Sequence, residues 1–322
     1  MKRHHQILAG ILVIQVVLSI FVFWPRSVVT GEGTPTFSGL EAEDIIALTI
    51  ADSDGNSIAL RRVGEGWALP EADDYPVQGD KITPLLGKIV SLTTSRLVTR
   101  TAASHKRLRV SADDFVRRLE FETADGTKYT FYLGSSPTYS STHFRVDGQN
   151  ETYLTDQITD WETRAEANSW VDTGYLLVSE EDIIRMTLNN ANGSFTFAKD
   201  DEGEWTMAGL AAGETLDEVE VTNTIRKAAS LNMDEPLGKE ELDTYGLDEP
   251  NAAVTLETKE KTITLRVGAE DPDDNTYVVI SSESPYYVRV SEFSVKELVE
   301  RTREDFLQQP PTPTPEGETS SS

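Results

Sequence analysis

The fold is decided by a stretch that occurs twice, EDIIALTI at Glu43–Ile50 and EDIIRMTL at Glu181–Leu188. The same offset of 138 residues places Trp67 opposite Trp205. Further matches follow in the same order, with small insertions, pairing residues 83–92 with 222–231, 126–134 with 260–268, and 153–154 with 287–288. A preserved order over about 130 residues indicates a tandem duplication of whole domains, because a solenoid repeat is much shorter.

Each copy combines strand and helix patterns. Apolar residues alternate on both sides of Asp54-Gly55, and again around Asp125-Gly126, which is typical of antiparallel hairpins. Residues 80–92 carry apolar side chains at helical spacing, and capping-box patterns at 159–162 and 294–297 predict the starts of closing helices. The predicted fold class is α+β: two tandem repeats, each an antiparallel sheet with one or two packing helices, plus one N-terminal transmembrane helix.

Residues 7–24 form an uncharged run, ILAGILVIQVVLSIFVFW. At ~1.5 Å per helical residue this run spans ~27 Å, close to the thickness of a bilayer core. Trp24 is placed to lie at the membrane interface, and Lys2 and Arg3 favour a cytoplasmic N-terminus. A signal peptide has a shorter apolar core and a small-residue cleavage site, so we favour an uncleaved single-pass anchor in the cell membrane, with cleavage as the alternative.

The sequence divides into five parts. These are a cytoplasmic tip and transmembrane anchor (1–26), a linker (27–38), repeat domain one (39–172), repeat domain two (173–307) and a disordered Pro/Thr/Ser tail (308–322). Both repeat domains and the tail are expected outside the cytoplasm.

Composition excludes several function classes. The 322 residues include 29 Lys+Arg and 55 Asp+Glu, a net charge of −26, which disfavours nucleic acid as a partner. The absence of cysteine removes disulfides, thiolate nucleophiles and Cys-containing metal sites. Only His105 and His143 lie beyond the expected anchor, and no hydrolase, zincin or phosphate-loop motif is present. We therefore expect no enzyme activity, no cofactor, no metal site and no catalytic residue.

Two groups of residues stand out as candidate sites. A basic stretch in repeat domain one is a possible docking strip for an acidic partner or for anionic headgroups, with a solvated surface as the alternative: Arg96, Arg100, Lys106, Arg107 and Arg109. Trp67 and Trp205 occupy equivalent places after the first hairpin of each copy, which favours core anchors over a sugar-stacking platform.

This arrangement resembles a known prokaryotic family, the domain of unknown function 4340 family. The resemblance covers most of residues 40–307 and rests on the anchor, the duplicated hairpin–Trp–helix pattern and the segment YGLDEP at Tyr245–Pro250. The first copy departs from that segment, with LRVSAD at Leu108–Asp113. The family has no established catalytic residues to carry over. Its members are associated with ABC transporters of the gliding-motility type, beside an ATPase, a permease and a second exterior protein.

The leading hypothesis is a membrane-anchored, extracytoplasmic, non-enzymatic accessory or binding subunit of such a transporter. Its expected partners are the lipid bilayer, through the N-terminal helix, and the transporter subunits that the resemblance implies. Two alternatives remain open, a module that binds or hydrolyses envelope polysaccharide and a structural spacer.

Overall fold

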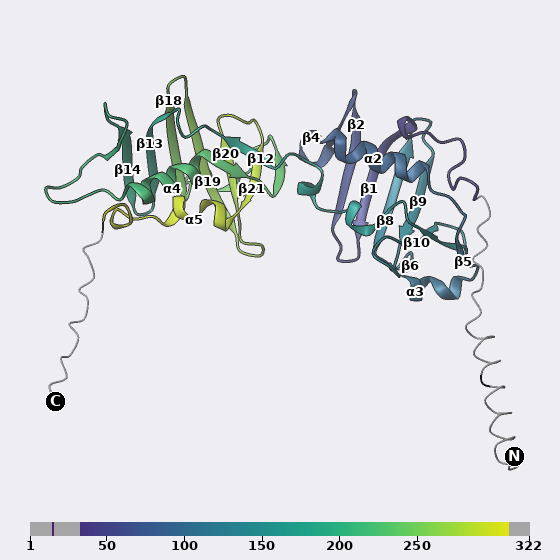
Figure 1. Cartoon of the computed structure of the whole chain (residues 1–322). Coiled ribbons are helices and arrows are strands. Elements are labelled where there is room, and N and C mark those ends of the chain that lie inside the picture. Colours follow the sequence, from purple (N-terminus) through teal and green to yellow (C-terminus); the bar gives the residue numbers. More distant parts are fainter. Residues whose placement is uncertain (1–14, 16–32, 309–322) are drawn as a thin grey trace, which may run out of the picture. The chain divides into compact units, whose positions relative to one another are not determined.

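The computed structural model describes residue 15 and residues 33–308 (Figure 1). Within those residues, no helix is both long enough and apolar enough to cross a membrane. The expected anchor with Trp24, apart from residue 15, lies outside the described residues, as do half of the linker and nearly all of the tail. The described part has an α+β fold of mostly antiparallel sheets with few helices.

The first sheet has nine strands in the order β4-β3-β2-β1-β8-β9-β10-β11-β5. In that order the strands span Tyr75–Val77, Gly66–Leu69, Ser57–Val63, Ile45–Asp52, Arg117–Thr123, Lys128–Leu133, Thr142–Val146, Thr152–Thr155 and Leu97–Thr99. The predicted turn at Asp54-Gly55 joins β1 to β2, with Ala51 opposite Ser57. The turn at Asp125-Gly126 joins β8 to β9. Both hairpin predictions are confirmed.

The second sheet has eight strands in the order β15-β14-β13-β18-β19-β20-β21-β17. They span Trp205–Met207, Gly193–Lys199, Ile183–Asn190, Ala252–Thr258, Thr262–Asp271, Thr276–Ser281, Tyr287–Ser291 and Glu235–Gly238. Apart from β4, the two sheets have the same strand order when the strands of each are counted along the chain.

Two small ribbons complete the strands. They are β12 (Gly174–Leu177) with β16 (Ser230–Asn232), and β6 (Val110–Ser111) with β7 (Asp114–Phe115).

Four α-helices lie among the described residues: α2 (Gly79–Val90), α3 (His105–Leu108), α4 (Glu218–Ala229) and α5 (Glu292–Glu300). The amphipathic pattern at 80–92 correctly predicted α2, whose apolar side chains are buried: Ile82, Leu85, Leu86 and Ile89. Figure 1 shows α4 and α5 side by side on the second sheet. Seven short 3-10 helices also occur in this part of the chain: η1 (Ala42–Asp44), η2 (Pro70–Ala72), η3 (Ala102–Ser104), η4 (Asp160–Glu162), η5 (Ala167–Ser169), η6 (Asp243–Tyr245) and η7 (Glu304–Phe306).

The two capping-box predictions have different outcomes. Thr159 and Glu162 do form a capping box, but it opens only the single 3-10 turn η4. Ser294 lies inside α5, whose N-cap is Ser291. Glu297 pairs with Arg301 one turn later, at 3.2 Å, so its carboxylate faces the helix C-terminus rather than the N-cap.

Described residues of the expected linker pack on the first sheet. Thr36 N–H donates to the Leu92 carbonyl at 2.7 Å, and Pro35 forms a bridge with Thr93. Phe37 is only 5% exposed and packs edge-on against Phe121. Residues 34–36 therefore lie beside residues 92–94, which lead into β5, a few residues before the predicted domain start.

Each sheet contains a glycine where the backbone of a preceding turn comes unusually close. A Cβ at Gly134, just after β9, would lie 2.1 Å from the Leu108 carbonyl oxygen. A Cβ at Gly268, in β19, would lie 2.1 Å from the Tyr245 carbonyl oxygen. Real Cβ atoms do not approach oxygen so closely, so only glycine fits at either position.

The residue after each of these carbonyls has a left-handed backbone. Gly246 has φ 64° and is the glycine of the YGLD segment, and Arg109 has φ 55° at the corresponding place in LRVSAD. The next residues, Leu247 and Val110, are buried. The LRVSAD segment therefore makes the same left-handed turn as the YGLD segment, which explains the YGLD segment as a structural feature.

Replacing Gly268 with alanine should lower the free energy of unfolding by about 2 kcal/mol or more, because the new Cβ must push the Tyr245 carbonyl out of place. The matched control is Gly87→Ala, at an exposed helical position with no atom within 4 Å of the new Cβ. That change should stabilise by about 0.5–1 kcal/mol. Urea unfolding followed by tryptophan fluorescence measures both, and equal midpoints for the two variants would contradict the close-approach argument.

Candidate functional site: an acidic pocket

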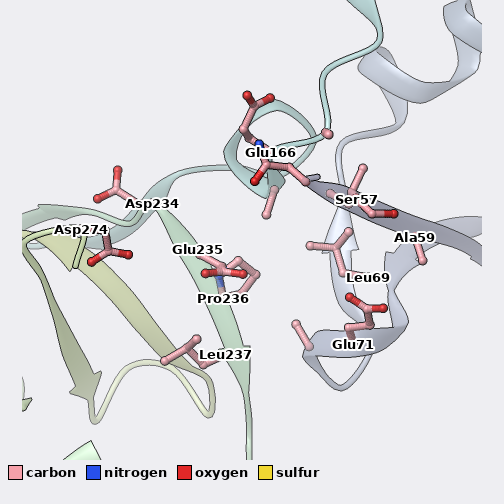
Figure 2. A pocket seen from close by; sticks show the side chains of 15 residues that line it. Ser57, Ala59, Leu69, Glu71, Glu166, Asp234, Glu235, Pro236, Leu237 and Asp274 are labelled. Atoms are coloured by element: carbon pink, nitrogen blue, oxygen red, sulfur yellow. The ribbon is translucent and has the colours of Figure 1, made fainter. Parts of the chain in front are cut away.

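The second compact unit, formed by residues 46–51, 56–83 and 164–308 among those described, contains a pocket of about 630 Å³. Its walls come from the start of β2, the end of β3 with η2, the segment 165–167, and β17 (Figure 2). A volume of this size is in the range of small-molecule and side-chain binding sites.

The ionisable residues that line this pocket are all carboxylic acids: Glu71, Glu166, Asp234, Glu235 and Asp274. Figure 2 shows Asp234 and Asp274 together on one side, and Glu71 on the opposite side from β17. We call these five residues the acidic pocket residues. Such a lining favours a cationic guest and disfavours an anionic one.

Two of the acidic pocket residues, Asp234 and Glu235, have a raised pKa. Partial desolvation, reinforced by the charge of Asp274, raises the pKa of Asp234 above its usual value. Partial desolvation also raises the pKa of Glu235, with Arg289 opposing and with Asp274 and Glu71 reinforcing the shift. The ionised pocket therefore holds uncompensated negative charge at neutral pH, and a bound cation would relieve it.

Arg289 is the nearest cation to this group, but it is shared. Its guanidinium lies 3.0 Å from an oxygen of Asp271 and 3.9 Å from one of Glu235. It also donates to the Thr276 hydroxyl at 3.3 Å. Because Asp271 takes the shorter contact, Arg289 neutralises the pocket only in part.

The predicted docking strip lies elsewhere, on and around α3. Lys106 pairs with Asp113 at 2.8 Å and Arg109 with Asp114 at 3.4 Å. Arg96 is 4.0 Å from Asp156. Arg100 and Arg107 are exposed, and neither side chain forms a hydrogen bond or ion pair within residues 33–308. The structure therefore places all five basic residues at one end of the first sheet.

The tryptophans do not line the acidic pocket. Trp67, on β3, is 6% exposed, with Arg62 over its ring at 5.3 Å. Trp205, on β15, is partly buried, with Lys199 over its ring at 5.1 Å. Their predicted role as core anchors stays a prediction.

Both histidines described here are occupied by structural contacts. His105 donates from Nε2 to the Asn150 carbonyl at 3.0 Å. His143 lies 2.6 Å from the Ser135 carbonyl and 3.2 Å from its hydroxyl, through the same nitrogen, Nδ1. Because Nδ1 donates to the carbonyl, it has no lone pair with which to activate the hydroxyl. Burial lowers the pKa of His143, partly offset by the Ser135 carbonyl.

A family model matches residues 67–235 and 211–309, and its description reads "Domain of unknown function (DUF4340)". The chain belongs to this family. All five acidic pocket residues lie within the residues matched to DUF4340. No curated protein and no solved structure matches the chain. The DUF4340 description names no activity, so function has to be argued from the residues of this chain.

Sequence reasoning did not find the acidic pocket. Its carboxylates come from segments more than 200 residues apart in this DUF4340 chain, between Glu71 and Asp274. In a sequence with 55 acids, no single acidic residue signals a site. Asp274 follows Asp271 and Asp273 in the turn between β19 and β20, where acids are ordinary turn residues. Only the tertiary fold distinguishes it from the others.

Replacing Asp274 with asparagine should lower the pKa of both Asp234 and Glu235, because it removes a negative charge that raises them. A carboxyl with a raised folded-state pKa stabilises the fold when protonated, and this stability is lost as the pH rises through that pKa. The variant should therefore lose less stability than the parent between acid and neutral pH.

Carboxyl carbon NMR titration gives the two pKa values, and thermal unfolding at acid and neutral pH gives the stability difference. Asp248→Asn is the matched control, since this exposed carboxyl influences neither group. Unchanged titration of Asp234 and Glu235 in the Asp274 variant would contradict the proposed coupling.

Proposed function

We propose that this protein is a membrane-anchored, extracytoplasmic binding subunit without chemistry of its own, which holds a cationic group of a partner or cargo in its acidic pocket. The partners implied by the family resemblance are the ATPase, permease and second exterior subunit of a gliding-motility-type ABC transporter.

The acidic pocket is the observation that carries this proposal. It combines a volume of about 630 Å³ with five carboxylates and no basic lining residue. A lysine or arginine side chain from a partner would meet several carboxylates at once and would displace little favourable charge pairing. Desolvation disfavours the ionised forms of Asp234 and Glu235, and a cationic guest would stabilise those ionised forms.

The proposed membrane anchor is supported by the sequence alone. The run at 7–24 has the length and apolarity of a membrane-spanning helix, and Lys2 and Arg3 precede it. With this orientation, the pocket would face the exterior, where the transporter's exterior subunit and its cargo are found.

We also infer that the two sheets arose by duplication of one α+β unit. Their shared strand order supports this, as do the paired glycines Gly134 and Gly268 and the paired left-handed residues Arg109 and Gly246. The acidic pocket takes lining residues from strands of both sheets, β2 and β3 of the first and β17 of the second. The proposed binding site therefore does not belong to one repeat alone.

A photo-crosslinking residue at Ser57, which lines the pocket, should capture transporter subunits when the full-length protein is illuminated in its own membranes. The same residue at Ser194, an exposed position outside the pocket, is the control and should capture them far less. Mass spectrometry identifies the products. If the variant with the crosslinking residue at position 57 gives no crosslinked product, the proposal is contradicted.

Charge removal tests the chemistry of the pocket. In the Ser57 crosslinking background, the triple change Glu71→Gln, Glu166→Gln and Glu235→Gln should reduce the crosslinked product about tenfold, because three attractive charges are lost while side-chain shape is kept. The triple change Glu181→Gln, Glu249→Gln and Glu260→Gln alters net charge equally at exposed positions outside the pocket. An equal loss in both triple variants would show that overall charge, rather than the pocket, governs capture.

A further inference from the structure

The segment 91–118 has a net positive charge, opposite in sign to that of the whole protein. It contains seven Lys or Arg and two Asp, within a chain of net charge −26. Both aspartates are already paired, Asp113 with Lys106 and Asp114 with Arg109. Arg100 and Arg107 are left exposed, with no hydrogen bond or ion pair from their side chains among residues 33–308. Positive charge at this end of the first sheet is therefore available to an external anion.

An exposed aromatic residue lies on a loop that is tied to the same end. Ser135 N–H donates to the carbonyl of Leu108, the last residue of α3, at 2.9 Å. This bond holds the loop between β9 and β10, which carries Tyr139, and Tyr139 is 92% exposed. Tyrosine is enriched at membrane–water interfaces, where its ring and hydroxyl match the two environments. We define the basic face as Arg96, Arg100, Lys106, Arg107, Arg109 and Tyr139.

The basic face also lies where the described chain begins. Thr94 N–H donates to the Thr34 carbonyl at 3.1 Å, and Thr36 N–H donates to Leu92, so residues 34–36 lie beside the segment that leads into Arg96 and β5. Eight residues, 25–32, separate the apolar run from Gly33. Fully extended, eight residues reach no farther than about 29 Å. A bilayer that holds the apolar run is therefore within reach of this end of the sheet.

We propose that the basic face docks on the anionic lipid headgroups of the membrane that the protein's own N-terminal run enters. The occupant is the lipid surface because positive charge, an exposed tyrosine and the short tether occur together. Docking would fix the first sheet against the bilayer and would require no protein partner. This inference rests on the proposed anchoring, and the test below separates the two.

The test uses the full-length protein with one fluorescent label. The chain has no cysteine, so Ala103→Cys, an exposed position in η3 between Arg100 and Lys106, gives a unique labelling site. The labelled protein is reconstituted into two kinds of vesicle. One is neutral phosphatidylcholine, and the other is phosphatidylcholine with about 30% anionic phosphatidylglycerol. Both vesicles carry an acceptor dye on a headgroup, and energy transfer reports how close α3 lies to the surface.

Energy transfer should be higher on the anionic vesicles, and added salt should abolish the difference. Each cation near an anionic surface strengthens binding about fivefold, so the pair Arg100→Glu and Arg107→Glu should weaken docking about 25-fold or more. The control pair Lys128→Glu and Arg185→Glu makes the same change in net charge. Lys128 is at the opposite end of β9 and Arg185 is in β13, so this control should keep the difference.

Equal energy transfer on neutral and anionic vesicles would overturn the docking proposal, and so would an unchanged signal in the Arg100 and Arg107 variant.

Anchoring is measured separately, by flotation of the protein with neutral vesicles. A protein that floats only with anionic vesicles, and loses this through Arg100→Glu and Arg107→Glu, supports docking and contradicts the anchor. If docking does not depend on lipid charge and the basic face crosslinks to an acidic protein, the basic face binds that protein, and the lipid proposal is overturned.

Discussion

The close contact between a backbone carbonyl and a glycine underlies both halves of this structure. In the first sheet, the Leu108 carbonyl lies against Gly134, and in the second the Tyr245 carbonyl lies against Gly268. Each contact brings a turn from another part of the chain against a sheet, just after β9 in the first and on β19 in the second, where any side chain would keep it away. In the first sheet that turn is the end of α3, so the contact also determines where the basic side chains of α3 are displayed.

Charge of the two signs is concentrated in different regions of this protein. The acidic pocket gathers five carboxylates, and desolvation together with neighbouring charge raises the pKa of Asp234 and Glu235. The segment around α3 presents cations that are only partly paired. Exposed ion pairs such as Lys106–Asp113 contribute little to stability because solvent screens them. These charges are therefore better explained by what they attract than by what they stabilise.

Local patterns in the sequence predicted much of the fold. The hairpins around Asp54-Gly55 and Asp125-Gly126 and the helix α2 follow from turn residues and apolar spacing, which act over a few residues. The start of α5 was predicted wrongly: serine is a common N-cap residue, and the helix begins after Ser291 rather than after Ser294.

The candidate site was much harder to predict than the fold. Glu71 and Asp274 become neighbours of one pocket only through tertiary structure, and nothing local marks either residue. The basic stretch, by contrast, was visible because its members are close in sequence. Sites built from one segment can be read from composition, whereas sites assembled from several segments require the fold.

Arg109 and Gly246 meet the same geometric requirement in different ways. The second copy meets the left-handed turn with Gly246, which has no steric cost, whereas the first meets it with an arginine at φ 55°. A side chain in this conformation costs roughly 1 kcal/mol, which the contacts of Arg109 with Asp114 and the Phe115 carbonyl partly offset. The same left-handed turn is thus formed without a side chain at Gly246 and with a cationic side chain at Arg109, so in the first sheet the turn also adds a positive charge to the protein surface.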